Sequence, residues 1–133
     1  MESSAIRRET ILVVEDEAPV LELIAGVLRN EGYPVLAAGN GEEAFRICSQ
    51  HEGIIDLILT DIVMPKISGG ELVRQIRPHR PNIKVLYMSG YTRYTTAARG
   101  ALESVETFIW KPFTPAELLL KVREVLDGPQ TPR

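Results

Sequence analysis

Short, wholly apolar segments alternate along this chain with longer amphipathic stretches. Ile11–Val14 and Leu57–Leu59 contain no polar residue, so they lack the alternation of a strand with one face in water. Strands of this composition are buried on both faces, which requires helices on each side of the sheet. Regular alternation of such strands with helices is typical of βα repeats. The sequence therefore predicts an α/β protein with a doubly wound parallel sheet.

The same pattern predicts five strands and five helices. The expected strands are Thr10–Val14, Tyr33–Ala38, Ile55–Thr60, Ile83–Met88 and Thr107–Trp110. The expected helices begin near Ala18, near Asn40, before Leu72, near Thr92 and at Thr114. They end before Gly32, near Gln50, before Pro78, near Leu102 and before Gly128. Asn40 with Glu43, and Thr114 with Glu117, have the spacing of a capping box.

Length and composition limit the kinds of protein that this chain can be. At 133 residues it fits one domain of ordinary size, with residues 1–8 and 128–133 as flexible ends. The formal net charge of −3 argues against direct binding to nucleic acid. No apolar run approaches the ~18 residues that suggest a membrane span. The single cysteine, Cys48, excludes an internal disulfide and favours a reducing cytoplasm.

Reactive polar residues stand at the ends of four expected strands. They are the adjacent acids Glu15 and Asp16, then Asp61, Ser89 and Lys111. In an open parallel sheet the carboxyl ends of the strands meet at one edge, where such sheets place their ligand sites. Two acids for a metal, an acceptor carboxylate, a hydroxyl and an ammonium would then converge. Phosphoryl transfer onto a carboxylate needs these residue types.

Four motifs at these strand ends resemble the receiver domain of two-component response regulators. They are Val13–Glu17, Leu59–Pro65 followed by Gly69, Met88–Gly90 and Trp110–Phe113. The resemblance covers residues 9–127, and it implies a flavodoxin-like sheet in the order 2-1-3-4-5 with five flanking helices. Met88–Tyr91 and Lys111–Thr114 are most similar to receivers of hybrid sensor kinases or to single-domain receivers. Whether the chain is a free-standing receiver or part of a hybrid kinase stays open.

The resemblance implies that Asp61 accepts a phosphoryl group from a histidine kinase or a histidine phosphotransfer domain. It assigns Mg²⁺ to Glu15, Asp16, Asp61 and the backbone carbonyl of Val63, a set of oxygen ligands that suits this ion. Glu15 stands where an aspartate is more usual. Its additional methylene allows it to reach the metal directly or through a water molecule, and both possibilities stay open.

The resemblance also implies how the phosphoryl group is held and sensed. Lys111 pairs with the phosphoryl oxygens, and the Ser89 hydroxyl donates a hydrogen bond to another of them. Movement of Ser89 then allows the ring of Phe108 to turn inward, although Phe108 can equally be read as a core residue. The output is expected to be a downstream protein, or a second copy of the chain, on the face of the fourth helix, last strand and last helix.

Two other interpretations of the chain were weighed against this one. A receiver-like interaction module that is never phosphorylated is expected to lose the acceptor or the lysine, whereas Asp61 and Lys111 are both present. A magnesium-dependent phosphatase that forms an aspartyl phosphate has its nucleophile after the first strand in an Asp-x-Asp pattern. Glu15–Glu17 does not have this pattern. We therefore expect a phosphoacceptor protein and not an enzyme.

Overall fold

The computed structural model describes residues 9–90 and 107–128. Its elements are β1 (Ile11–Val14), α1 (Ala18–Asn30), β2 (Val35–Ala38), α2 (Gly41–Gln50), β3 (Leu57–Asp61), α3 (Gly69–Ile76), β4 (Lys84–Ser89), β5 (Phe108–Trp110) and α5 (Pro115–Asp127). The helix expected near Thr92–Leu102 lies outside the described residues, so the label α4 is not used. No helix within the described ranges is long and apolar enough to cross a membrane.

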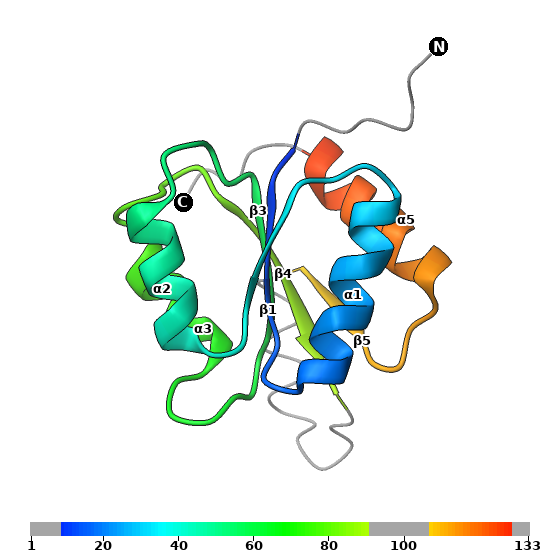
Figure 1. Cartoon of the computed structure of the whole chain (residues 1–133), viewed down its shortest axis with the longest axis horizontal. Helices are drawn as coiled ribbons and strands as arrows, with labels where there is room; N and C mark the ends of the chain where they lie inside the picture. Colours follow the sequence, from blue (N-terminus) through cyan, green and yellow to red (C-terminus); the bar gives the residue numbers. More distant parts are fainter. Residues whose placement is uncertain (1–8, 91–106, 129–133) are drawn as a thin grey trace.

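All five strands run parallel in one sheet, in the order β2-β1-β3-β4-β5. This confirms the predicted fold class and strand order. Figure 1 shows α1 and α5 on one face of the sheet and α2 and α3 on the other. The strands are in register at their carboxyl ends, because Asp61 lies opposite Met88 and Ser89 lies opposite Trp110.

The hydrophobic core consists of two layers, one on each face of the sheet. The layer under α2 and α3 includes Leu12, Val14, Ile58, Val85, Tyr87, Ala44, Cys48, Leu72, Val73 and Ile76. The layer under α1 and α5 includes Ile11, Val13, Leu57, Leu59, Leu86, Met88, Ile24, Leu28, Leu118 and Val122. Neighbouring residues of each central strand enter opposite layers, since side chains alternate along a strand. Burial in both layers explains why these strands contain no alternating polar residues.

Local side-chain bonds define the beginnings of α2 and α5. The Asn40 side chain accepts the Glu43 backbone N–H at 2.7 Å, as predicted, but Glu43 in turn accepts the N–H of Gly39 at 2.8 Å. At α5 the full capping box forms, because Thr114 accepts from the Glu117 N–H and the Glu117 carboxylate accepts from the Thr114 N–H. Both helices therefore begin where sequence spacing predicts, with a modified box at α2.

Every strand begins later than expected, β2 and β3 by two residues, at Val35 and Leu57, and β1, β4 and β5 by one. Pro34 precedes β2 and has no N–H to donate to a neighbouring strand. Before β3, the Asp56 carboxylate accepts the backbone N–H of Thr10 at 2.7 Å. The N–H groups of Asp56 and Leu57 also donate to the Thr10 carbonyl, at 2.9 and 3.3 Å, so main-chain and side-chain bonds together tie the entrance of β3 to the segment before β1.

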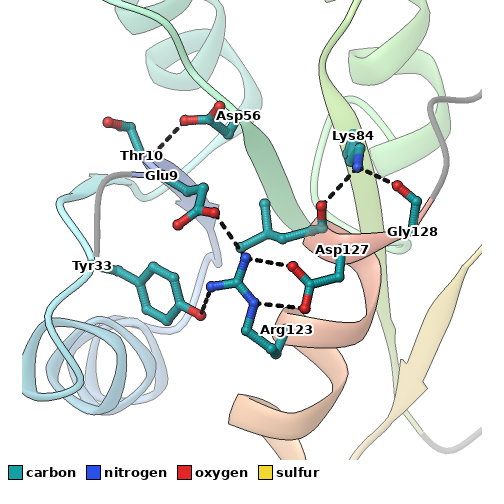
Figure 2. Close-up of polar contacts among 9 residues, drawn as sticks. Glu9, Thr10, Tyr33, Asp56, Lys84, Arg123, Asp127 and Gly128 are labelled. Atoms are coloured by element: carbon teal, nitrogen blue, oxygen red, sulfur yellow. Dashed lines mark hydrogen bonds and ion pairs between the residues drawn. The ribbon is translucent and has the colours of Figure 1, made fainter. Parts of the chain in front are cut away.

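Arg123 of α5 lies at the amino edge of the sheet, where the strands begin (Figure 2). Its guanidinium donates to the Glu9 carboxylate at 2.8 Å, to the Asp127 carboxylate at 2.9 and 3.2 Å, and to the Tyr33 hydroxyl at 3.2 Å. These partners come from the segment before β1, the α1–β2 connection and the last turn of α5. We call this group of four residues the amino-edge network.

Lys84, at the start of β4, holds the end of α5 from the other side (Figure 2). Its ammonium donates to the backbone carbonyls of Leu126 and Gly128, both at 2.8 Å. The last carbonyls of a helix have no partner within the helix, and a cation near them also interacts favourably with the helix dipole. Together with the amino-edge network, Lys84 therefore anchors the C-terminal end of α5 to the sheet.

Arg123→Met is expected to lower the free energy of unfolding by about 1–2 kcal/mol at pH 7. The hydrogen bond from Arg123 holds the pKa of Glu9 below its ordinary value of 4.5. Because the pKa of Glu9 is lower in the folded protein than in the unfolded chain, the stabilisation by this ion pair is complete above pH 4.5. It is lost as the pH falls through the pKa of Glu9 in the folded protein. Urea unfolding at a series of pH values should therefore show a deficit that shrinks on acidification.

Arg74→Met is the matched control, because Arg74 pairs with Glu71 within one exposed turn of α3. Such pairs contribute about 0.3–0.5 kcal/mol. Equal losses for the two variants, or a loss for Arg123→Met that does not depend on pH, would contradict a stabilising role for the amino-edge network.

Candidate functional site

Four predicted site residues meet at the carboxyl edge of the sheet. One carboxylate oxygen from each of Glu15, Asp16 and Asp61 lies within 4.8 Å of the others. The Lys111 ammonium lies 2.7 Å from a carboxylate oxygen of Asp61 and 2.7 Å from one of Glu15. The structure therefore brings three acids and one cation, from the ends of β1, β3 and β5, into a single cluster.

Side-chain alternation explains why three of these residues face the same way. Asp61 follows Leu57 and Leu59 on the α1 and α5 side of β3. Glu15 and Lys111 extend β1 and β5 by one residue each, since their backbone N–H groups still bond to the neighbouring strands. Their positions continue the rows of β1 and β5 that face α1 and α5. The register of the sheet thus places all three side chains on one side.

Burial sets the electrostatics of the acceptor candidate. Asp61 is 6% exposed, and its burial, reinforced by the neighbouring Glu15, raises the pKa of its carboxyl to about 7 against the opposing effect of Lys111. Burial also opposes the charge of Lys111, yet hydrogen bonds to Asp61 and Glu15 keep the pKa of its ammonium above the ordinary value. The cluster carries more negative charge than one lysine neutralises. A second cation there would favour the ionised form of Asp61.

The donor set of the cluster fits Mg²⁺. Glu15, Asp16 and Asp61 offer hard carboxylate oxygens, and the exposure of Asp16 leaves room for the water molecules that this ion retains. Val63 follows Asp61 by two residues, and its side chain is 79% exposed beside the cluster's end of the sheet. The assignment of its backbone carbonyl as a further ligand stays a prediction.

The β3–α3 connection folds back onto the acceptor's own peptide group. The Gly69 N–H donates to the Ile62 carbonyl at 2.7 Å, and a Cβ atom at Gly69 would lie 2.0 Å from the carbonyl oxygen of Asp61. Lys66 has a φ of 75°, and the Ile67 N–H donates across it to the Pro65 carbonyl. This is a γ-turn, a strained conformation for a residue with a side chain. Only a glycine at position 69 permits such a close return.

Ser89 and Phe108 lie at the same edge but on the other face of the sheet. Ser89 is buried, and its hydroxyl donates to the Gly90 carbonyl at 3.4 Å and not to the acids. Phe108 packs partly against the layer under α2 and α3, with its ring edge-on to Trp110 at 4.5 Å between centroids. Because Ser89 pairs with Trp110 and Tyr87 with Phe108, Ser89 and Phe108 are diagonal neighbours on two adjacent strands.

Two features of the site were not anticipated from the sequence. The bond between Glu15 and Lys111 joins residues 96 positions apart, so no local spacing signals it. Lys66 adopts a left-handed conformation that usually favours glycine or asparagine, and no turn dipeptide marks it. Tyr91, the last residue of the Met88–Tyr91 motif, lies outside the described residues.

Comparison with known proteins identifies relatives whose similarity extends over most of this chain. The family model described as "Response regulator receiver domain" matches residues 11–123. The sensor kinase CckA of Brucella abortus is 35% identical over 118 residues, which are 89% of this chain and 12% of that protein. The chain therefore spans a small part of the length of this curated relative.

Two solved structures are similar in both sequence and fold. The receiver domain of the hybrid histidine kinase CckA has a TM-score of 0.73 and 34% identity, covering 89% of this chain and 99% of that chain. A response regulator receiver domain protein from Clostridium thermocellum has a TM-score of 0.76 and 29% identity, covering 90% and 94% of the two chains.

Gly69→Ala is expected to destabilise the protein by about 1–3 kcal/mol, because the added methyl group must displace the Asp61 peptide. The same displacement should weaken magnesium binding, which titration of the fluorescence of Trp110, the single tryptophan, can follow. Gly70→Ala is the matched control, since its Cβ would lie 4.0 Å from the nearest neighbouring atom among the described residues. Alanine also favours a helix over glycine by about 1 kcal/mol. Equal stability and magnesium affinity for the two variants would contradict this account.

Proposed function

This chain belongs to the family of response regulator receiver domains, and we propose on that premise that it is the phosphoacceptor of a two-component phosphorelay. The observation that carries the proposal is the buried Asp61 carboxylate, which lies 2.7 Å from the Lys111 ammonium beside two further acids. Asp61 ends β3, the position expected for the acceptor of a receiver and not for the nucleophile of an aspartyl-phosphate phosphatase.

The proposed reaction is a phosphoryl transfer from a phosphohistidine to Asp61. A carboxylate oxygen of Asp61 attacks phosphorus, and an O–P bond forms as the P–N bond breaks. The electron pair of that bond returns to the imidazole nitrogen, which takes up a proton, and Asp61 becomes an acyl phosphate. Lys111 offsets the charge of the phosphoryl oxygens, and most of the remaining catalysis is placement of the reactants.

In this proposal Asp61, Asp16 and the backbone carbonyl of Val63 would hold magnesium, and the family resemblance also assigns Glu15 to it, directly or through a water molecule. The charge of the ion offsets the mutual repulsion of three acids and of the incoming phosphoryl group. The protein is itself modified in this reaction, so we regard it as an acceptor and not as an enzyme that acts on a separate substrate.

The proposed partners are proteins. The donor is a histidine kinase or a histidine phosphotransfer domain, and the net charge of −3 disfavours nucleic acid as a direct partner. The free thiol of Cys48 is buried in α2, which is consistent with a reducing cytoplasm as the compartment. A receiver-like module that is never phosphorylated would need neither Lys111 nor the carboxylate of Asp61 at this edge.

The proposed output surface includes a groove between β5 and α5. The groove has a volume of about 410 Å³ and is lined by Phe108, Trp110, Phe113 and Leu120, with two acidic residues, Glu117 and Glu124, and one basic residue, Lys121, which pairs with Glu124. Leu120 is 73% exposed, so it offers an apolar contact in water. Apolar anchors flanked by basic residues would suit this surface, whether they belong to a downstream protein or to a second copy of the chain.

Phosphorylation with acetyl phosphate and magnesium tests the acceptor assignment. Intact mass should show one added phosphoryl group on the wild type and none on Asp61→Asn, because the amide lacks the nucleophilic carboxylate. Chelation of magnesium should suppress labelling of the wild type. Asp56→Asn is the matched control, since Asp56 lies at the amino edge and contacts Thr10. A wild type that stays unlabelled with magnesium present, or an Asp61→Asn variant that is labelled normally, would remove the proposal.

Trp110 fluorescence tests the proposed switch, because the Trp110 ring contacts Phe108 and should respond when Phe108 turns. A hydrogen bond to a charged group contributes about 1.5–3 kcal/mol, so Ser89→Ala should lower the ratio of switched to unswitched molecules on the order of 10- to 100-fold. The fluorescence change per phosphorylated molecule should then fall. Ser49→Ala, on the exposed face of α2, is the control. A full fluorescence change in Ser89→Ala would show that Ser89 does not couple the site to Phe108.

A further inference from the structure

Glu15 and Asp16 are adjacent in sequence but lie in different environments. Glu15 is 1% exposed, and both of its carboxylate oxygens are engaged. One accepts the Lys111 ammonium at 2.7 Å, and the other accepts the Glu17 backbone N–H at 3.1 Å. Asp16 is exposed, and among the described residues its carboxylate makes no hydrogen bond or ion pair.

These environments suit different tasks. Magnesium gives up its water molecules reluctantly, so it favours a carboxylate that is open to solvent, as in Asp16. Both oxygens of Glu15 already accept a protein donor, whereas Asp61 accepts Lys111 through one oxygen only. Among the described residues, Asp16 and the second oxygen of Asp61 therefore offer the carboxylate oxygens of the cluster that no hydrogen-bond donor occupies.

Lys111 needs a second anchor because it approaches Asp61 from a distant strand. In the order β1-β3-β4-β5, two strand spacings, about 10 Å, separate β5 from the strand of Asp61, and three, about 14 Å, separate it from the strand that Glu15 follows. The lysine stem is flexible, and contact with Asp61 alone would leave its direction poorly defined. Glu15 supplies this anchor from the far side, and its additional methylene extends its reach beyond that of an aspartate. Lys111 therefore lies between two carboxylates.

We propose that Glu15 is a positioning residue, which holds the Lys111 ammonium at the acceptor, whereas Asp16 and Asp61 provide the carboxylate ligands of the metal. This inference rests on the proposed phosphoacceptor function and deepens it. When a phosphoryl group esterifies Asp61, that carboxylate loses its charge, and the bond to Glu15 keeps Lys111 facing the phosphoryl oxygens. The role of Glu15 thus differs from the ligand role that the family resemblance implies.

Magnesium titration of Glu15→Gln and Asp16→Asn, followed by Trp110 fluorescence, separates the two roles. The variants are matched, because each replaces an acid by its amide and removes one formal charge from the same cluster. Asp16→Asn should raise the magnesium Kd about tenfold, which is the effect of losing ~1.4 kcal/mol of binding. The factor by which Glu15→Gln raises the magnesium Kd should be at least about three times smaller than the factor for Asp16→Asn, since Lys111 already compensates the charge of Glu15. Any smaller difference between the variants overturns the proposal, and circular dichroism confirms that each is folded.

A double-mutant cycle with Lys111→Met tests whether Glu15 acts through the lysine. The readout is the rate of phosphorylation by phosphoramidate at saturating magnesium, which needs no kinase. Glu15→Gln should slow the rate about 10–100-fold when Lys111 is present, as loss of a supporting residue commonly does. In the Lys111→Met background the same change should have less than about a threefold effect. Equal slowing in both backgrounds overturns the proposal.

The two measurements keep this inference separate from the proposed function. If wild-type protein accepts no phosphoryl group from any small donor, the phosphoacceptor function fails. The magnesium titration then still decides between a ligand role and a positioning role for Glu15, because it requires no phosphorylation.

Discussion

The ion pairs of Lys111 make the carboxyl edge of this fold possible. A buried carboxylate is costly unless it is paired, and here two of three clustered acids are almost wholly buried. The lysine ammonium lies 2.7 Å from both of them. Lys111 follows β5, whereas Glu15 follows β1 and Asp61 ends β3. The cluster therefore exists only when β1, β3, β4 and β5 have formed in the order that brings these strand ends together.

The two edges of the sheet are organised differently. At the amino edge, Arg123 and Lys84 satisfy carboxylates and helix-end carbonyls, and these contacts fix the C-terminal end of α5. At the carboxyl edge, one lysine faces three acids, which leaves negative charge that a further cation can offset. A region with fully paired groups opens less readily than one with uncompensated charge. Conformational changes at the carboxyl edge should therefore affect β5 and the N-terminal half of α5 before they affect the anchored C-terminal end of α5.

The sequence is sufficient to predict the strands and the chemical types of the site, because both depend on patterns along the chain. Burial on two faces removes polar residues from β1 and β3, and aligned strand ends collect Asp61 and Lys111. The strand order came from the family resemblance, since hydrophobic patterning does not distinguish one parallel arrangement from another. The contact between the Asp56 carboxylate and the Thr10 N–H forms only in the folded protein, so no local pattern predicts it. The Glu15–Lys111 bond escaped prediction for the same reason.

The geometry also limits how a signal can leave the site. Glu15 and Asp61 follow strand rows that face α1 and α5, whereas Ser89 and Phe108 belong to the face covered by α2 and α3. A change at Asp61 must therefore cross the sheet to reach Phe108, and Ser89 ends β4, the strand beside that of Asp61. Its present bond to Gly90 is long at 3.4 Å, so releasing it costs little. A shift from 1:99 to 99:1 requires ~5.5 kcal/mol, more than the ~1.5–3 kcal/mol of one new charge-assisted bond. Under the proposed function, Ser89 can direct the switch, but rearrangement of Lys111 and the metal must supply the remaining free energy.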